Sequence, residues 1–236
     1  MSTQSEMAFN ESDASIIKKR KVDYIFLLTF MVLSFVFITP LSKILSLGHI
    51  VQQVLSGLTT VVWYIFCYRV TSNFYKSKWF KITYACLLTF QLIFNGYIFE
   101  QENTQITSLV LPASIGYVAN LVGFSLVFYI LLKDIFMRKH DLTYSLLGAS
   151  NIYFLIPVIF CYIYSLVAVH NPSIVNADPF TIKEVLFNCW DYSWYVLVGI
   201  DYPAGKIGEE LQSIAILESI SADLFIVFII GRLMIR

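Results

Sequence analysis

Two carboxylates stand in the last long apolar segment of the chain, residues 212–232, where a charged side chain is costly. Glu218 lies in the run AILESIS and Asp223 in the run SADLFIV. An acidic side chain inside a membrane span costs a few kcal/mol unless it faces water or a polar partner, and such groups mark ion or substrate pathways. Five residues of a helix turn through about 140°, so the two groups are expected to do different jobs. The alternative for each is a protonated or snorkelling side chain without a function.

The remaining reactive groups form no catalytic or metal-binding pattern. The cysteines have no C-x-x-C spacing and lie in apolar segments, and the histidines stand singly at segment ends. The pair Glu209-Glu210 resembles the glutamates of membrane proteases, but no histidine or basic residue follows at a useful spacing, and no G-x-S-G or G-x-G-D motif is present. We therefore expect no enzyme activity, no catalytic residue, no metal site and no cofactor.

Composition places the chain in a membrane. Of 236 residues, 58% are hydrophobic and 14% charged, and the mean hydropathy is +0.71. So many apolar side chains cannot be hidden in one soluble core, so lipid must cover much of the surface. The net charge is zero and no basic face is present, which argues against nucleic acid as a partner. The sequence predicts an all-α integral membrane protein surrounded by lipid, with no inferable soluble partner.

Six segments are long and apolar enough to cross a bilayer about 30 Å thick. They are residues 24–46, 50–68, 82–99, 108–132, 142–169 and 212–232. Residues 1–22 are polar, end in Lys18-Lys19-Arg20-Lys21, and are expected to be a disordered cytoplasmic tail. Residues 23–137 then form a block of four spans. The fourth span lacks Lys and Arg, so voltage-sensor charges are missing.

The basic residues predict the orientation. Lys and Arg in short loops concentrate on the cytoplasmic side. With six spans and a cytoplasmic N-terminus, only Lys43, Lys183 and Lys206 of the 16 basic residues fall on the outer side. Both ends of this multi-pass chain are therefore expected in the cytoplasm.

The loop between the last two spans has structure of its own. Thr181 as N-cap and Glu184 three residues later form a capping box, which predicts the start of a helix over 181–198. Its apolar and aromatic part is about fifteen residues long, too short to cross the bilayer, and a re-entrant helix is the natural interpretation. A lid in the outer leaflet or an extracellular amphipathic helix is the alternative.

The residues of this part resemble a known family. From DLTYSLLGASNIYFLIPVIFCYIYSLV to LQSIAILESISADLFIVFIIGRLM, the chain is similar to bacterial potassium-channel-like proteins with a two-span pore domain behind four further spans. The similarity covers residues 138–236, while the first 137 match only in length and hydropathy. It implies an outer helix at 142–169, a pore helix at 181–198, a filter-like loop at 199–208 and an inner helix at 212–232. It also implies a homotetramer in the bacterial inner membrane.

The filter-like loop departs from the family. A potassium filter holds ions with backbone carbonyls of T-V-G-Y-G-type loops. Aligned by the pore-helix aromatics, the chain offers Gly199, Ile200, Asp201, Tyr202 and Pro203, and the aromatics are Trp190, Tyr192, Trp194 and Tyr195. Asp201 and Pro203 replace the two signature glycines, and proline fixes φ and lacks an N–H. Asp201 forms a pore-facing acidic ring, pairs with a neighbour such as Lys206 behind the loop, or faces the outer solution.

The resemblance also suggests roles for the two carboxylates of the last span. Family members tend to have a glutamate at the place of Glu218, which suggests packing behind the pore helix, and Asp223 replaces a family glutamine and is assigned to the cavity wall. The sequence thus predicts a passive cation channel for potassium or sodium, with altered or lost potassium selectivity. The alternative is a nonconducting pore-fold scaffold or regulatory subunit. A secondary transporter is disfavoured, because only one re-entrant segment is found.

Overall fold

The structure is a computed structural model that describes residues 2–33, 49–75, 77–100, 106–137, 142–171, 174, 182–200 and 209–234. Over these residues it contains seven α-helices, one short 3-10 helix and no strand, which confirms the all-α class. The elements are α1 (Ser2–Leu33), α3 (His49–Phe74), α4 (Lys78–Glu100), α5 (Ile106–Met137), α6 (Leu142–His170), α7 (Ile182–Val198), η3 (Glu209–Leu211) and α8 (Gln212–Met234).

Three helices of the described part are long and apolar enough to cross a membrane. They correspond to Leu109–Phe136 in α5, Leu142–His170 in α6 and Gln212–Arg232 in α8. This finding confirms the membrane class in its general form. The other three expected spans and the arrangement of four helices plus two stay predictions.

Helix α1 corrects the expected tail. Residues 1–22 are expected from their composition to be disordered, whereas α1 begins at Ser2 and continues without a break to Leu33. The segment contains neither glycine nor proline, the two strongest helix breakers. Near its middle, Arg20, Asp23 and Tyr24 are buried against other helices. Tertiary contacts of a kind that composition does not reveal therefore anchor this helix.

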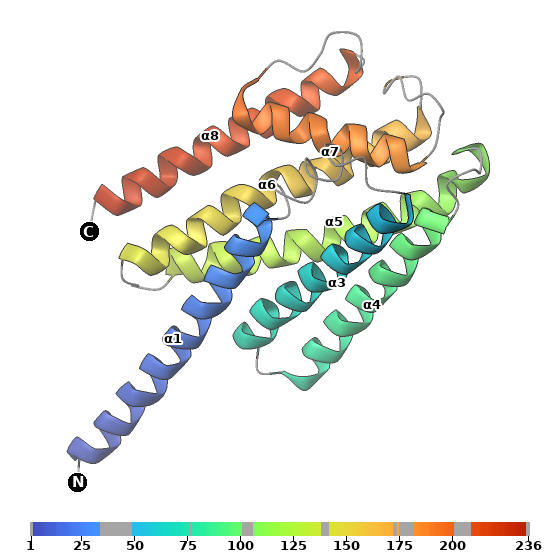
Figure 1. Cartoon of the computed structure of the whole chain (residues 1–236). Helices are drawn as coiled ribbons and strands as arrows, with labels where there is room; N and C mark the ends of the chain where they lie inside the picture. Colours follow the sequence, from blue (N-terminus) through green and yellow to red (C-terminus); the bar gives the residue numbers. More distant parts are fainter. Residues whose placement is uncertain are drawn as a thin grey trace.

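Helix α6 is the centre of the arrangement. Helices α5 and α6 lie side by side and antiparallel, and α7 and α8 pack on the far side of α6 (Figure 1). Helices α3 and α4 form a second antiparallel pair next to α5, and α1 crosses against α3 and α6. Helix α6 therefore contacts both the amino-terminal helices and the last two helices.

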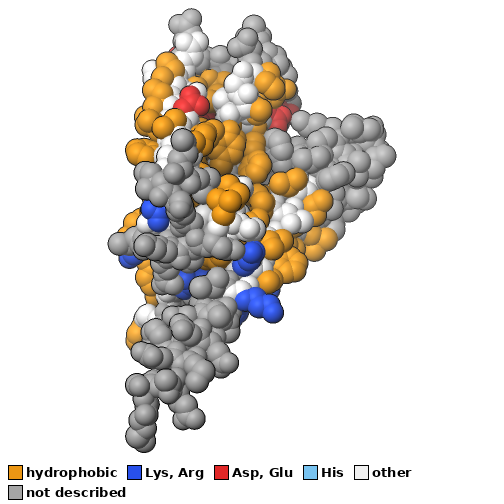
Figure 2. Space-filling model, turned by 90° about the vertical axis from the view of Figure 1, so that its left-hand side faces the viewer, with side chains coloured by type: hydrophobic (Ala, Val, Ile, Leu, Met, Phe, Trp, Pro, Cys, Tyr) orange, Lys and Arg blue, Asp and Glu red, His pale blue; other side chains and the backbone are white. Residues whose placement is uncertain are grey.

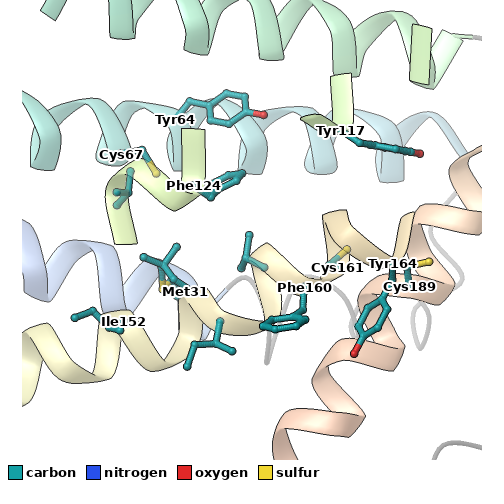
Figure 3. Close-up of a cluster of buried hydrophobic side chains, with 14 of the residues drawn as sticks. Met31, Tyr64, Cys67, Tyr117, Phe124, Ile152, Phe160, Cys161, Tyr164 and Cys189 are labelled. Atoms are coloured by element: carbon teal, nitrogen blue, oxygen red, sulfur yellow. The ribbon is translucent and has the colours of Figure 1, made fainter. Parts of the chain in front are cut away.

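One buried cluster runs through both halves. Figure 3 shows Met31 and Tyr64 in its amino-terminal part, and Cys161, Tyr164 and Cys189 where α6 meets α7. Between α4 and α5, glycines allow close approach. A Cβ added at Gly116 would lie 1.7 Å from Cε1 of Phe94, so only glycine fits beside this ring.

The charges are unevenly distributed along the helices. On the face in Figure 2, Lys and Arg side chains gather toward the lower end and Asp and Glu toward the upper end, with hydrophobic side chains between them. In Figure 1 the last turns of α3, α5 and α8 and the first turns of α4 and α6 lie on the same side of the molecule. Basic residues of this side are Arg69, Lys78, Lys81, Lys133 and Arg232. One end of the bundle is thus basic.

Candidate functional site in the last three helices

Glu218 is enclosed where α6, α7 and α8 meet. Its exposed fraction is 0%. The hydroxyl of Tyr164, from α6, lies 2.6 Å from Oε2. The hydroxyl of Ser193, from α7, lies 2.5 Å from Oε1. Each carboxyl oxygen therefore has a hydroxyl partner from a different helix, and this side chain links all three helices.

Ser193 also binds helix α6 directly. Its Oγ lies 2.8 Å from the backbone oxygen of Pro157, and Pro157 is a residue inside α6. Nearby, the ring of Tyr164 meets that of Tyr192 edge-on, with centroids 5.1 Å apart. Ser193 is fully buried. The carboxyl of Glu218 thus forms part of a hydroxyl and aromatic cluster that attaches α7 to α6.

The four aromatic residues predicted in the pore helix, Trp190, Tyr192, Trp194 and Tyr195, lie in α7 and differ in burial. Tyr192 and Trp194 are buried, while 36% of Tyr195 is exposed. Trp194 packs on Phe154 of α6 with ring centroids 5.8 Å apart, and Trp190 lies 6.0 Å from Trp194 by the same measure. Three of the four therefore lie in or beside the contact with α6.

The first two residues of the filter-like loop end helix α7. Gly199 has φ of +69°, in the left-handed region. The N–H of Gly199 donates to the carbonyl of Val196 at 3.1 Å, and the N–H of Ile200 donates to that of Tyr195 at 3.0 Å. This pair of bonds is the Schellman motif, in which glycine favours the left-handed position after the helix. Gly199 is thus a helix cap, a role that the comparison with a filter did not anticipate.

The structure does not describe four of the predicted site residues. Asp201, Tyr202, Pro203 and Thr181 lie outside the described residues. Glu184 lies in the first turn of α7 and is half-buried. The structure therefore places the helix before the filter-like loop but says nothing of an acidic ring at Asp201.

Asp223 lies on a different face of α8 from Glu218. The buried face of α8 carries Glu218, Ala222 and Phe225. Asp223 is exposed and falls near the middle of the apolar stretch Gln212–Arg232. Four apolar residues share its face at alternating spacings of four and three, with exposed fractions of 49–64%: Ile216, Ile220, Val227 and Ile230. We call these four residues and Asp223 the α8 stripe.

A second polar cluster, which the sequence analysis missed, joins α1, α5 and α6. Asp134 of α5 forms an ion pair with Arg20, with Nη1 and Oδ1 3.2 Å apart. Its Oδ2 accepts hydrogen bonds from the hydroxyls of Tyr24, at 2.9 Å, and Tyr144, at 2.5 Å. All four residues are buried. Sequence reasoning assigned Arg20 to the tail, and no local pattern indicated its partner 114 residues away.

A further buried carboxylate, that of Asp23 in α1, lies next to the Arg20–Asp134 cluster. Oδ1 of Asp23 lies 2.7 Å from Nη2 of Arg69, and its Oδ2 accepts a hydrogen bond from the side-chain amide of Asn73. The backbone oxygen of Asn73 in turn accepts a hydrogen bond from Arg20, at 3.2 Å. The guanidinium of Arg20 also stands 4.0 Å from the ring centre of Phe74. Helix α3 is thereby joined to the Arg20–Asp134 cluster.

A neutral network lies among α3, α4 and α5. The hydroxyl of Tyr64 donates to Asn120 at 2.6 Å and accepts from the amide of Asn95 at 2.8 Å. The amide of Asn120 donates to Oδ1 of Asn95 at 3.3 Å. Three buried or half-buried polar side chains thus satisfy one another, which suits a structural role inside an apolar environment.

Comparisons with known proteins leave the family undecided. The chain matches no family model, no curated protein and no solved structure. Within the described residues, no group of three or more His, Cys, Asp or Glu side chains could hold a metal ion. The potassium-channel-like family therefore stays a prediction from the sequence, and function must be inferred from the contacts of the chain itself.

Proposed function

We propose that the chain is one subunit of a homo-oligomeric, channel-like membrane protein that passes monovalent cations passively along α8. The observation that carries this proposal is the α8 stripe, with exposed Asp223 among exposed Ile and Val residues. Lipid is a poor cover for this face, because a carboxylate at mid-span costs about 2.5–3.5 kcal/mol or more when it faces hydrocarbon.

The spacing of the stripe supports contact with other copies of α8. Alternating steps of four and three residues place side chains on one seam, as in helices that pack together along their length. Helix α8 already contacts α6 and α7, and Glu218 on its buried face binds Tyr164 and Ser193. The stripe is therefore available for neighbouring subunits, and a closed ring of identical subunits brings it to a common axis.

A ring of Asp223 carboxylates would favour cations over anions. Carboxylate rings attract cations and repel anions in channel pathways. Four copies, the number implied by the family resemblance, would place four carboxylates around the axis. We assign the basic end of the bundle to the cytoplasm, in keeping with the preference of Lys and Arg for that side.

Helix α7 supports a pore module of the kind predicted. It has 17 residues, which corresponds to about 26 Å of helix and includes polar residues. It packs against both α6 and α8 and ends in the Gly199 cap. A short helix that is held in this way and capped before the predicted filter-like loop is what a pore module requires.

Ion flux from purified protein in liposomes tests the proposal. We expect potassium or sodium flux, and a reversal potential shifted toward lower cation preference in Asp223→Asn. Glu210→Gln is the matched control, because Glu210 is an exposed carboxylate in η3, just before α8 and away from mid-span. No flux over a range of pH and lipid would overturn the channel and favour the nonconducting scaffold.

A further inference from the structure

Glu218 has no cation beside it in the described structure. Among the described residues, the titratable groups that interact with it include Tyr164 and Cys161 from α6 and Tyr192 from α7. Asp191 of α7, near the same cysteine, is itself acidic. Among the described residues, no Lys or Arg forms an ion pair with Glu218. A buried carboxylate without a counter-charge is costly, so the position of its proton matters.

The two contacts of the Ser193 hydroxyl indicate whether the carboxyl group of Glu218 carries a proton. A serine hydroxyl carries one hydrogen, yet its Oγ lies 2.8 Å from the Pro157 carbonyl oxygen and 2.5 Å from Oε1 of Glu218. The carbonyl oxygen can only accept. If Ser193 donates to Pro157, the short contact with Glu218 needs a hydrogen from the carboxyl group. If it donates to Glu218 instead, two oxygen lone pairs face each other at Pro157.

We infer that Glu218 is a neutral carboxylic acid that donates to Ser193 and accepts from Tyr164. The Ser193 hydroxyl then donates to the Pro157 carbonyl, and every oxygen in the chain of contacts is satisfied. Glu218 is in this way a positioning residue, because it fixes α7 against α6 and α8. Its neutral state does not depend on ion conduction, whereas an effect on the pathway rests on the proposed function.

A neutral buried acid predicts a specific pH dependence. The folded protein binds one proton more at Glu218 than the unfolded chain, in which the carboxyl ionises in water. Stability must therefore fall as pH rises through the range where only the folded state holds this proton. In Glu218→Gln the amide can donate to Ser193 and accept from Tyr164, so the hydrogen bonds persist while this pH dependence is lost.

Infrared spectroscopy of the reconstituted protein at neutral pH tests the inference. We expect the carbonyl band of a protonated carboxylic acid in the wild type, its loss in Glu218→Gln, and its retention in Asp223→Asn, the matched change on the exposed face of α8. A wild-type spectrum without a Glu218-dependent band would overturn the neutral acid. Flux plays no part in this readout, so failure here is separate from failure of the channel proposal.

Two further measurements guard against a variant that fails to fold. Ser193→Ala removes the acceptor of the carboxyl hydrogen, so the band is expected to shift to higher frequency. The band of the wild type is also expected to disappear as alkaline pH begins to unfold the protein. A band whose frequency is unchanged in Ser193→Ala, or one that titrates at acidic pH like an exposed carboxyl group, would contradict the assignment.

Discussion

Helix α6 contacts a buried carboxyl group near each of its ends, and the two sites differ in how the group is accommodated. Near the amino end, Tyr144 donates to Asp134, which also faces the guanidinium of Arg20. Near the carboxyl end, Tyr164 donates to Glu218, whose other described partner is a serine hydroxyl. Two tyrosines of α6 therefore donate to buried carboxyl groups: Tyr144 to one that is paired with a cation, and Tyr164 to one without a cation among its described partners.

The difference separates two ways of joining helices inside an apolar environment. A buried ion pair is stable only while both partners are present, because removal of either one leaves the other as an uncompensated buried charge. A neutral acid needs only hydrogen-bond partners and responds to pH. The first arrangement ties α1 and α5 to α6, and the second ties α7 and α8 to α6. The amino-terminal helices should thus be the less tolerant of substitution.

The largest expected effect is the loss of the charged partner. Arg20→Met leaves Asp134 buried without its cation and should lower the free energy of unfolding by about 3–5 kcal/mol. Lys19→Met is the matched control, because Lys19 is exposed on the same turn of α1. Chemical denaturation in bicelles measures both.

A double variant checks that the loss comes from the pair. Arg20→Met combined with Asp134→Asn should be no less stable than Arg20→Met alone, because the second change removes the uncompensated charge. Simple addition of the two losses would show that Arg20 and Asp134 are not energetically coupled.

A smaller effect should distinguish the two tyrosines. Hydrogen bonds to charged groups contribute about 1.5–3 kcal/mol and neutral ones about 0.5–1.5 kcal/mol. Tyr144→Phe should therefore destabilise the protein more than Tyr164→Phe does. Tyr97→Phe, at a position with 43% of the side chain exposed, is the control. Equal losses for the two buried tyrosines would remove the distinction between a charged and a neutral acid.

The sequence predicts the helices well and their partners poorly. Apolar length and capping signals predict residues 142–169 and 181–198 as helices, and α6 and α7 end within a residue of these limits. Such signals are local. The pairing of Arg20 with Asp134 is not local, and in the sequence Arg20 is one of four consecutive basic residues. Burial of a single member of that run follows only from the packing of α1 against α3 and α6, which brings Arg20 to Asp134 of α5.

The candidate site shows the same limit. Helical geometry predicts that Glu218 and Asp223 face different ways, and they do so in α8. The hydroxyl partners of Glu218 come from α6 and α7, and no spacing rule connects them to position 218. Gly199 is conspicuous as a glycine after a short helix, which is the usual signal of a cap. The same glycine also aligns with the start of a filter loop, so the local sequence alone does not separate the two roles.

Cysteine cross-linking in the membrane tests most directly whether the α8 stripe faces other copies of the chain. The background is Cys86→Ser, because Cys86 is exposed and the other three cysteines are buried. Val227→Cys, in the stripe, should form disulfide-linked dimers under mild oxidation. Leu217→Cys, at a position with a similar exposed fraction (58% against 64% for Val227) but on another face of α8, should stay monomeric. Equal cross-linking at the two positions, or none at Val227, would contradict a shared axis along α8.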